Sequence, residues 1–234
     1  MEGNVGAGKS SLIEVLKSRH KDWNFIAEPV DVWSSIKSDN GESLLEVYYK
    51  DRKRWSYSFQ SYALLSRFQN TQNAMALATQ SGQGAAKSLE KGGDDIKTIF
   101  VTERCIETDY HVFVKMLRDQ GAMDRLELEL YDRLYRHLQN SLTAPLSAII
   151  HVDTSPVECL QRIKSRNRVG ESVLTLEYLA SVEKYQRSWM DSLTDMPVMA
   201  TAGTASGSAI SEIESFVNRQ LVSARDRRSY NVCL

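Results

Sequence analysis

Hydrophobic residues follow two alternating patterns along this chain. Short runs of apolar and β-branched residues, typical of buried strands, are separated by longer stretches in which apolar residues recur every three or four positions, as in amphipathic helices. The predicted strands are residues 24–27, 98–101, 148–152 and 197–200. This alternation predicts an α/β domain in which helices flank a parallel sheet.

The longest helical pattern runs from residue 44 to residue 77 and predicts one long helix. Further helices are expected at residues 108–117, 123–141, 155–166 and 176–193, and after a turn of small residues at 202–208. Residues 79–97, rich in Gly, Ser, Gln and charge, predict a surface loop, and residues 222–234 predict a flexible tail. We expect one domain, residues 1–234.

Residues 3–10, Gly-Asn-Val-Gly-Ala-Gly-Lys-Ser, match the phosphate-binding loop of nucleotide-triphosphate enzymes. In such a loop, backbone N–H groups and the N-terminus of the next helix face the phosphates, and a glycine turn without a ligand is the alternative. Lys9 then reaches the β- and γ-phosphates, and the Ser10 hydroxyl holds Mg²⁺. The predicted nucleotide-binding residues are Gly3, Asn4, Val5, Gly6, Ala7, Gly8, Lys9, Ser10 and Ser11.

A buried parallel strand normally leads into this loop. Here only Met1 and Glu2 precede Gly3. We therefore expect the first strand to be missing from the chain, or its central place in the sheet to be filled by residues from elsewhere.

Composition narrows the function classes. With 234 residues and 42% hydrophobic residues, the chain can bury a substantial core. Its 29 Lys and Arg against 30 Asp and Glu provide no basic surface of the kind that nucleic-acid binding requires. Three cysteines lie far apart, which argues against disulfides and zinc and favours a reducing compartment. We expect a cytoplasmic protein with small-molecule chemistry, neither bound to nucleic acid nor inserted in a membrane; a mitochondrial location stays open.

Charged residues are predicted at the carboxyl ends of two strands, where ligands bind in this class of fold. Glu28 follows the first predicted strand and is either a general base or a solvated acid. Glu103 and Arg104 follow the second. Next to a phosphate-binding loop, such a carboxylate helps to hold Mg²⁺, and such an arginine stabilises charge on a transferring phosphoryl group.

Three arginines gather at the end of the helix that Ser155 and Pro156 start. They are Arg162, Arg166 and Arg168. Cations this close repel one another unless an anion lies between them, which favours a lid over phosphates at about residues 162–173. A solvated basic helix end is the alternative.

A set of side chains suited to contact a base is predicted along the long helix and its neighbours. On one face of that helix the spacing places Tyr49, Gln60, Ala63 and Arg67. Asp109 and Phe113 on the next helix, and Trp33, would complete a polar end and a stacking wall, although each aromatic residue taken alone is better explained as core.

These motifs together resemble those of the deoxynucleoside kinases, and most closely the deoxycytidine and deoxyguanosine kinases. The resemblance covers most of the chain. It rests on residues 2–10, the Glu-Pro-Val sequence at 28–30 with Trp33, residues 54–60 and 65–67, Glu103-Arg104, Asp109, the three lid arginines and residues 176–179. It implies a P-loop kinase fold with about five strands and a helical lid, a homodimer built on helices, and ATP or another triphosphate as the donor with Mg²⁺.

The resemblance also implies roles for the catalytic residues. Glu28 would take the 5′-hydroxyl proton of a deoxynucleoside, beside Arg104, which orients the nucleophile and the phosphoryl group. Lys9 would contact the donor phosphates, and Glu103 would assist Mg²⁺. The arginines expected to close over the phosphates are Arg162, Arg166 and Arg168.

The nucleoside site is implied in the same way. Tyr49 and Glu171 would hold the sugar 3′-hydroxyl, and Gln60 would pair with the base between Trp33 and Phe113. A trio of Ala63, Arg67 and Asp109 is similar to the deoxycytidine and deoxyguanosine kinase subgroup, so we expect dC, dA or dG to be preferred over dT.

The chain departs from the family at Cys105, where a serine is usual, so that a weaker hydrogen-bonding thiol replaces a hydroxyl. Several alternatives stay open: a thymidine kinase of the same family, a nucleoside monophosphate kinase, and a non-catalytic P-loop protein. A GTP switch protein is disfavoured because no Asn-Lys-x-Asp motif occurs.

Overall fold

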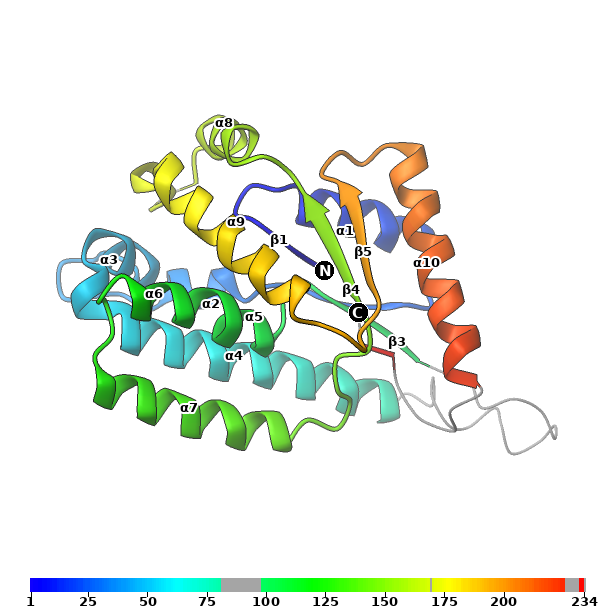
Figure 1. Ribbon diagram of the computed structural model, residues 1–234, viewed down its shortest axis with the longest axis horizontal. Helices are drawn as coiled ribbons and strands as arrows, with labels where there is room; N and C mark the ends of the chain where they lie inside the picture. The colour runs from blue at the N-terminus through cyan, green and yellow to red at the C-terminus, as the bar shows by residue number, and fades with distance from the viewer. Residues whose placement is uncertain (81–97, 169, 226–231, 234) are drawn as a thin grey trace.

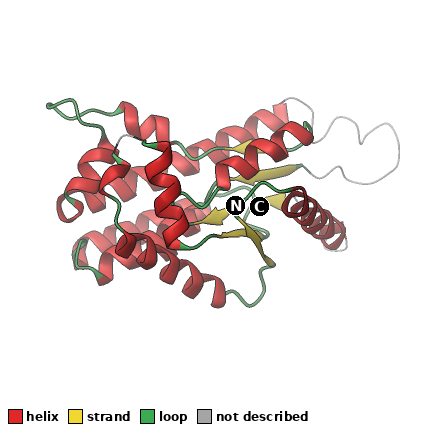
Figure 2. Ribbon diagram, turned by 90° about the horizontal axis from the view of Figure 1, so that it is seen from above, coloured by secondary structure: helices red, strands yellow, loops and turns green. Residues whose placement is uncertain are grey.

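The computed structural model describes residues 1–80, 98–168, 170–225 and 232–233. Its strands lie in the middle of the molecule with helices on both sides (Figure 2). Every paired strand is parallel to its neighbour. This is the helix-flanked parallel sheet that the hydrophobic pattern predicts.

The strands form two groups of three. One has the order β1–β4–β5, with β1 at Glu2–Gly3, β4 at Ile149–Asp153 and β5 at Val198–Ala202. The other has the order β2–β3–β6, with β2 at Asn24–Ile26, β3 at Ile99–Thr102 and β6 at Val232–Cys233. The predicted strand positions are each correct to within about two residues.

The place of the expected first strand is filled by two short segments, residues 1–3 and β6. Glu2 and Gly3 pair with His151 and Val152 of β4. The Met1 amino group donates to the Thr102 carbonyl, and the Met1 carbonyl accepts from the Arg104 N–H. Strand β2 pairs with one edge of β3, so Met1 and β6 both lie on the other edge. Residues 1–3 therefore bond both β3 and β4, and they join the two groups of strands.

The helices of the first half are α1 (Lys9–Arg19), α2 (Val30–Ser35), α3 (Leu44–Lys50) and α4 (Arg52–Gln80). The single long helix predicted from residue 44 is therefore two helices. Ser43 and Glu46 form a capping box that starts α3, and the non-helical backbone of Asp51 ends it. The apolar spacing continues across the break between α3 and α4, so the sequence pattern did not reveal the break.

In the second half, the helices after β3 are α5 (Ile106–Thr108), a π-helix η1 (Asp109–Val114), α6 (Lys115–Asp119) and α7 (Arg125–Asn140). After β4 come α8 (Pro156–Arg166), the 3₁₀ turn η2 (Glu171–Val173) and α9 (Leu176–Asp191), and β5 is followed by α10 (Gly207–Arg225). The loop predicted at 79–97 begins within α4, and its residues 81–97 lie outside the described residues. Of the predicted tail, residues 222–225 belong to α10 and 232–233 to β6.

Two groups of helices enclose the sheet. Helices α4 and α7 lie side by side along one side of the molecule, whereas α1 and α10 lie towards β4 and β5 (Figure 1). The larger hydrophobic core joins the sheet to α1, α8, α9 and α10, and a second core joins α3, α4 and α7. The carboxyl ends of β1, β2 and β3 open between these two cores, so this is where the site lies.

Candidate active site

A cavity of about 480 Å³ opens at the carboxyl ends of β1, β2 and β3. It is lined by every predicted site residue except Gly3 and Asn4, the first two residues of the phosphate-binding loop. Residues from between Val5 and Tyr178 thus meet where the strand-end rule predicts a ligand.

The phosphate-binding loop has the backbone shape that its glycines allow. Gly6 and Gly8 have φ of 77° and 103°, which side chains with a Cβ rarely adopt. A Cβ on Gly6 would also lie 2.7 Å from the Cys159 carbonyl oxygen of α8. Gly8 is the N-cap of α1, so the first turn of that helix faces the cavity. This arrangement fits a chain of phosphates.

Lys9 is buried in the floor of the loop. Its Nζ donates to the Gly3 and Asn4 carbonyls at 3.2 and 2.9 Å, and lies 3.9 Å from a Glu103 carboxylate oxygen. Burial and the nearby Arg104 together lower the pKa of Lys9 to about 8, against the opposing effect of the surrounding carboxylates. Because this pKa is close to neutral pH, an anionic ligand next to Lys9 would stabilise its charged form.

Ser10 and Glu103 meet at the mouth of the loop. The Ser10 hydroxyl donates to both carboxylate oxygens of Glu103, at 3.1 and 3.2 Å. A hydroxyl next to a carboxylate is an all-oxygen donor set, which suits Mg²⁺ with its remaining positions taken by water and phosphate. The two residues predicted to hold the metal therefore fit it.

Glu28 lies between two buried arginines. Arg104 Nη1 donates to Glu28 Oε1 at 2.7 Å, and Arg67 Nη2 donates to the same oxygen at 3.1 Å. Burial alone would raise the pKa of Glu28, but Arg104, Arg67 and Lys9 outweigh it and lower the pKa to about 2. Glu28 is thus ionised at neutral pH. Both arginines bond Oε1, and among the described residues none donates to Oε2, which can therefore accept from a substrate hydroxyl.

Arg67 also holds Asp109. Its Nε donates to Asp109 Oδ2 at 3.0 Å, and its Nη1 donates to the Glu103 carbonyl at 3.1 Å. Burial raises the pKa of Asp109 despite the neighbouring Arg67. One guanidinium thereby links the strand-end acids to the polar end of the predicted base site.

Asp109 and Phe113 are brought to the cavity by the π-helix η1. Both line the cavity, whereas Val112 and Val114 between and beyond them pack into the two cores. Single turns of π-helix occur mostly at functional sites, because the wider turn changes which side chains share a face.

Arg104 has a strained backbone. Its φ of 62° is unusual for a residue with a side chain. The Met1 carbonyl accepts from its N–H, and the Gly3 carbonyl accepts from its Nη2 at 3.3 Å. The segment before the phosphate-binding loop thus fixes the arginine that contacts Glu28.

Cys105 lies next to Arg104 and keeps part of the expected hydrogen bonding. Its thiol lies 3.4 Å from Glu2 Oε1, to which the Thr108 hydroxyl donates at 2.5 Å. Burial raises the pKa of Cys105 well above its ordinary value, so the group stays a thiol. Thr108 makes the shorter of the two hydrogen bonds to Glu2.

Aromatic side chains form the walls of the predicted base site. The Trp33 indole N–H donates to Ser66 Oγ at 2.9 Å, which fixes its ring against Phe59. The Arg104 guanidinium lies over the Phe113 ring, 5.1 Å from its centroid. Both rings are buried yet line the cavity, as a stacking role requires.

Tyr49 lies on α3 and not on the face of α4 that carries Gln60, Ala63 and Arg67. The one-face prediction is therefore wrong for Tyr49, because the helix ends at Lys50. Tyr49 still lines the cavity, and its hydroxyl has a pKa well above its ordinary value because it is buried near Tyr178 and Glu171.

The lid arginines are held in two different ways. Arg166 donates to both oxygens of Glu171 at 2.7 Å, and Arg168 lies 3.5 Å from Glu171. Arg162 instead donates to the carbonyls of Ala7 and Gly203, at 2.8 and 3.0 Å. The three therefore do not share one anion.

Sequence reasoning missed several residues of the cavity wall. Tyr48 stacks on Phe59 with their ring centroids 4.3 Å apart, and its hydroxyl accepts from Gln60 Nε2 at 3.5 Å. Leu45 and Tyr178 also line the cavity. The sequence feature that could have indicated Leu45 and Tyr48 is their helical spacing with Tyr49, which core packing explains equally well.

Comparison with known proteins gives one consistent answer. A family model described as deoxynucleoside kinase matches residues 1–220. The chain is 29% identical over 222 residues to the deoxycytidine kinase of Homo sapiens, covering 85% of this chain and 80% of that protein. It is 30% identical over 204 residues to the deoxycytidine kinase of Rattus norvegicus, with 81% and 74% covered. It is 28% identical over 206 residues to the mitochondrial deoxyguanosine kinase of Xenopus laevis, with 83% and 73% covered.

Proposed function

Because the chain belongs to the deoxynucleoside kinase family, we propose that it transfers the terminal phosphoryl group of ATP to the 5′-hydroxyl of dC, dA or dG in preference to dT. Phosphoryl transfer to a deoxynucleoside is the reaction of the family. ATP as the donor, Mg²⁺ as the metal and the order of bases are our proposal. The observation that carries it is the pair of arginines on Glu28 at the edge of the phosphate-binding loop.

Glu28 is assigned as the base for the 5′-hydroxyl. A carboxylate with a pKa of about 2 is a weak base, so its main contribution is to orient the hydroxyl for in-line attack and to receive its proton as the new P–O bond forms. Arg104 fixes Glu28 and faces the transferring group, where positive charge stabilises the equatorial oxygens.

Lys9 and the N-terminus of α1 are assigned to the donor phosphates. Ser10 and Glu103 would hold Mg²⁺, which when bound neutralises charge on the β- and γ-phosphates. Burial of Lys9 places its charge in a low-dielectric site, where it acts more strongly on an anion than it would in water.

The base preference rests on Arg67 and Asp109. Their mutual hydrogen bonds leave a fixed polar edge at the end of the cavity, next to Ala63. A polar edge favours the exocyclic amino groups of cytosine, adenine and guanine, which thymine lacks. It offers no apolar pocket to the thymine methyl group.

The sugar 3′-hydroxyl is assigned to Tyr49 and Glu171. Both are adjacent in the cavity wall, since Glu171 is among the groups that raise the Tyr49 pKa. Glu171 is 4% exposed and already paired with Arg166, so nucleoside binding and the lid share one carboxylate.

We also propose a homodimer through α4 and α7. These helices pack together, and three leucines stay exposed on them: Leu77, Leu126 and Leu130, at 65%, 67% and 45%. Leu126 and Leu130 are one turn apart and form a small apolar stripe. Light scattering after gel filtration should give about twice 26.5 kDa, and a mass of one chain would contradict the dimer.

The compartment is proposed to be the cytoplasm, because Cys105 and Cys159 are both free thiols. None of the helices in the described ranges is long and apolar enough to cross a bilayer.

The test is ATP-dependent phosphorylation of dC, dA, dG and dT in parallel, with Lys9→Ala as the blank. Activity on the first three above that on dT supports both the reaction and the base site. A preference for dT would keep the reaction and overturn the role of Arg67 and Asp109. Absence of transfer to every nucleoside would overturn the proposed function.

A further inference from the structure

One carbonyl group of the phosphate-binding loop accepts hydrogen bonds from two side chains outside the loop. Ala7 is fully buried, and its carbonyl oxygen accepts from the Thr154 hydroxyl at 2.9 Å and from Arg162 Nη1 at 2.8 Å. Thr154 comes directly after β4, and Arg162 lies two turns into α8. The loop is therefore held from outside by residues that the sequence motif does not contain.

The turn after β5 also contacts this part of the phosphate-binding loop. Gly203 follows β5, and its carbonyl accepts from Arg162 Nη1 at 3.0 Å. A Cβ on Gly203 would lie under 3.0 Å from three atoms, namely the Ala7 carbonyl oxygen, Thr154 Oγ1 and Arg162 Nη1. A Cβ on Gly8 would in turn meet the Gly203 carbonyl. Two glycines thus let the turn after β5 rest directly on the loop.

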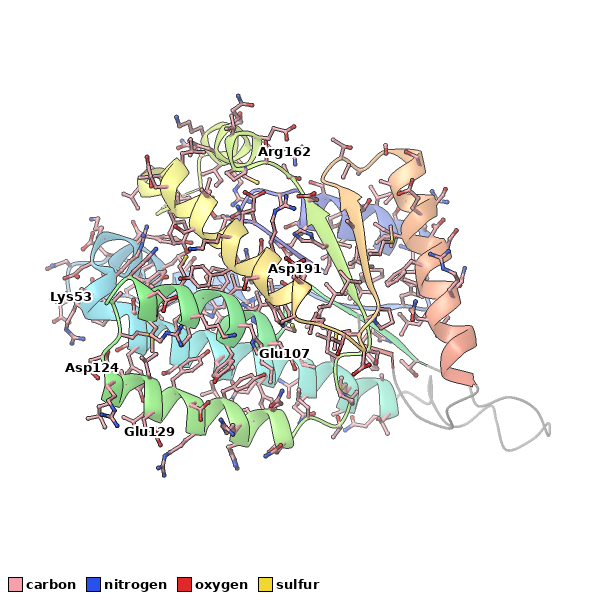
Figure 3. All side chains as sticks on the ribbon, viewed as in Figure 1. Lys53, Glu107, Asp124, Glu129, Arg162 and Asp191 are labelled. Atoms are coloured by element: carbon pink, nitrogen blue, oxygen red, sulfur yellow. The ribbon has the colours of Figure 1, made fainter. Side chains whose placement is uncertain are left out.

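These contacts set Arg162 apart from the two arginines that follow it. Arg162 Nη1 donates to two backbone carbonyls. Its Nε and Nη2 make no hydrogen bond to the residues that the structure describes. Arg166 instead uses Nε and Nη2 on the Glu171 carboxylate and is about one-third exposed. Figure 3 shows Arg162 on α8, on the side of the turn that follows β5.

We propose that Thr154 and Gly203 are positioning residues for phosphoryl transfer, which hold the Ala7 carbonyl and Arg162 as a fixed part of the phosphate cradle. On this view Arg162 keeps its carbonyl partners when the donor binds, and offers Nε and Nη2 to the phosphates. Only Arg166 and Arg168 move as a lid. The inference deepens the proposed function and rests on it for the identity of the donor.

The physical reason is the direction of the loop amides. A phosphate-binding loop works when its N–H groups face the ligand and its carbonyls face away. Two donors on the Ala7 carbonyl keep that peptide from rotating, so the neighbouring N–H groups are aligned before the donor arrives. Loss of one donor leaves a buried carbonyl with fewer partners and a less fixed loop.

The first test compares Thr154→Val with Thr154→Ser. Valine keeps the shape of the side chain but removes the hydroxyl, whereas serine keeps the hydroxyl. We expect Thr154→Val to weaken Mg²⁺·ATP binding and raise KM for ATP by roughly tenfold, the effect of one hydrogen bond. KM for dC should stay within about twofold because the nucleoside site does not touch Thr154. Serine should restore most of the ATP affinity.

The second test compares Gly203→Ala with Gly207→Ala. A Cβ at Gly203 meets three atoms, whereas a Cβ at Gly207, at the start of α10, meets nothing within 4 Å. We expect Gly203→Ala to raise KM for ATP by roughly tenfold to a hundredfold and Gly207→Ala to leave it unchanged. Melting temperature is recorded for all four variants, to separate loss of the cradle from loss of the fold.

Calorimetric titration with Mg²⁺·ATP makes the outcome independent of turnover. Equal ATP affinity in wild type and Thr154→Val would overturn the inference, as would an equal loss in Thr154→Val and Thr154→Ser. Equal effects of the two glycine changes would also overturn it. A wild-type protein that binds ATP but phosphorylates no nucleoside would overturn the proposed function alone, whereas one that binds no ATP would overturn both.

Discussion

Two buried glutamates each hold two arginines, but in different surroundings. The side chains of Glu28 and Glu171 are 11% and 4% exposed, so both carboxylates are largely removed from water. The arginines on Glu28 have side chains that are 4% and 6% exposed, whereas those on Glu171 are 34% and 45% exposed. The first set has no room to exchange partners, and the second has solvent on one side.

The difference separates a preorganised site from an exchangeable one. Arg67 and Arg104 are each tied to a second partner, a carboxylate or a backbone carbonyl, so Glu28 keeps its surroundings through the reaction. Arg166 has no partner besides Glu171 among the described residues, so its move to phosphates would take a partner from the Glu171 carboxylate alone. We therefore expect the ion pairs of Glu28 to position the reacting groups, and those of Glu171 to open when the lid closes over the phosphates.

The largest effect is expected for Glu28→Gln, which removes the base but keeps the shape of the side chain. Turnover should fall by about a thousandfold, while the dissociation constant for dC should stay within about threefold. Single-turnover rates and equilibrium binding check the two parts separately. Unchanged turnover would remove Glu28 as the base.

The next effect concerns the base site. Replacing both members of the polar edge, Arg67→Met with Asp109→Ala, should raise the dT:dC ratio of kcat/KM by roughly tenfold or more, since an apolar edge accepts the thymine methyl. Because Arg67 also supports Glu28, kcat should fall for all nucleosides. The ratio is therefore the decisive readout, and an unchanged ranking would show that the base is read elsewhere.

A smaller effect is expected on the exchangeable side. Arg166→Ala should lower kcat/KM for ATP by roughly tenfold and change the melting temperature only slightly, because solvent reaches Arg166 and Arg168 stays beside the Glu171 carboxylate. Steady-state kinetics at several salt concentrations test this. A large loss of melting temperature would mean that the Glu171 pair is as fixed as the Glu28 set.

The pH profile gives a further contrast between Lys9 and Glu28. Burial lowers the pKa of Lys9 to about 8, so the free enzyme loses this cation as the pH rises through 8, and kcat/KM for ATP should decline there. The pKa of Glu28 is about 2, so protonation of this carboxylate should cause no loss of kcat/KM down to about pH 5. An alkaline limb absent up to about pH 9 would contradict the state of Lys9.

The smallest effect is expected at the surface. Arg133 and Glu129 form a pair on α7 whose side chains are 76% and 58% exposed, and Figure 3 shows Glu129 on the outer side of that helix. Arg133→Ala should leave kcat, both KM values and the melting temperature within error, which makes it the matched control for the buried arginines. A measurable loss of activity would show that α7 affects the site, for example through a dimer.

The phosphate side of the cavity could be predicted from the sequence in more detail than the nucleoside side. Residues 3–10 are contiguous, and local backbone chemistry dictates their shape. Arg67 could be placed on the correct helix face, but its bonds to Glu28 and Asp109 depend on how three separate elements pack. Tyr48 gave no signal distinct from core packing, and the π-helix at Asp109 has no local sequence signature.

Two other features depend on long-range geometry in the same way. The partners of Arg162 are backbone carbonyls, which no sequence motif identifies. The arginine cluster therefore predicted one lid, whereas Arg162 bonds the backbone and Arg166 and Arg168 lie at Glu171. The first strand was expected to be missing from the chain, or its place to be filled by residues from elsewhere. The backbone of Met1 bonds β3 on the edge that β6 also pairs, a contact between segments more than a hundred residues apart.

The central claim is that Glu28 keeps its arginines while Glu171 gives up its own, and a crystal structure with dC and a non-hydrolysable ATP analogue tests it most directly. The account predicts Arg67 and Arg104 still bonded to Glu28, Arg162 still on Ala7, and Arg166 moved from Glu171 to the phosphates. Arg166 remaining on Glu171, or Arg104 leaving Glu28, would contradict it.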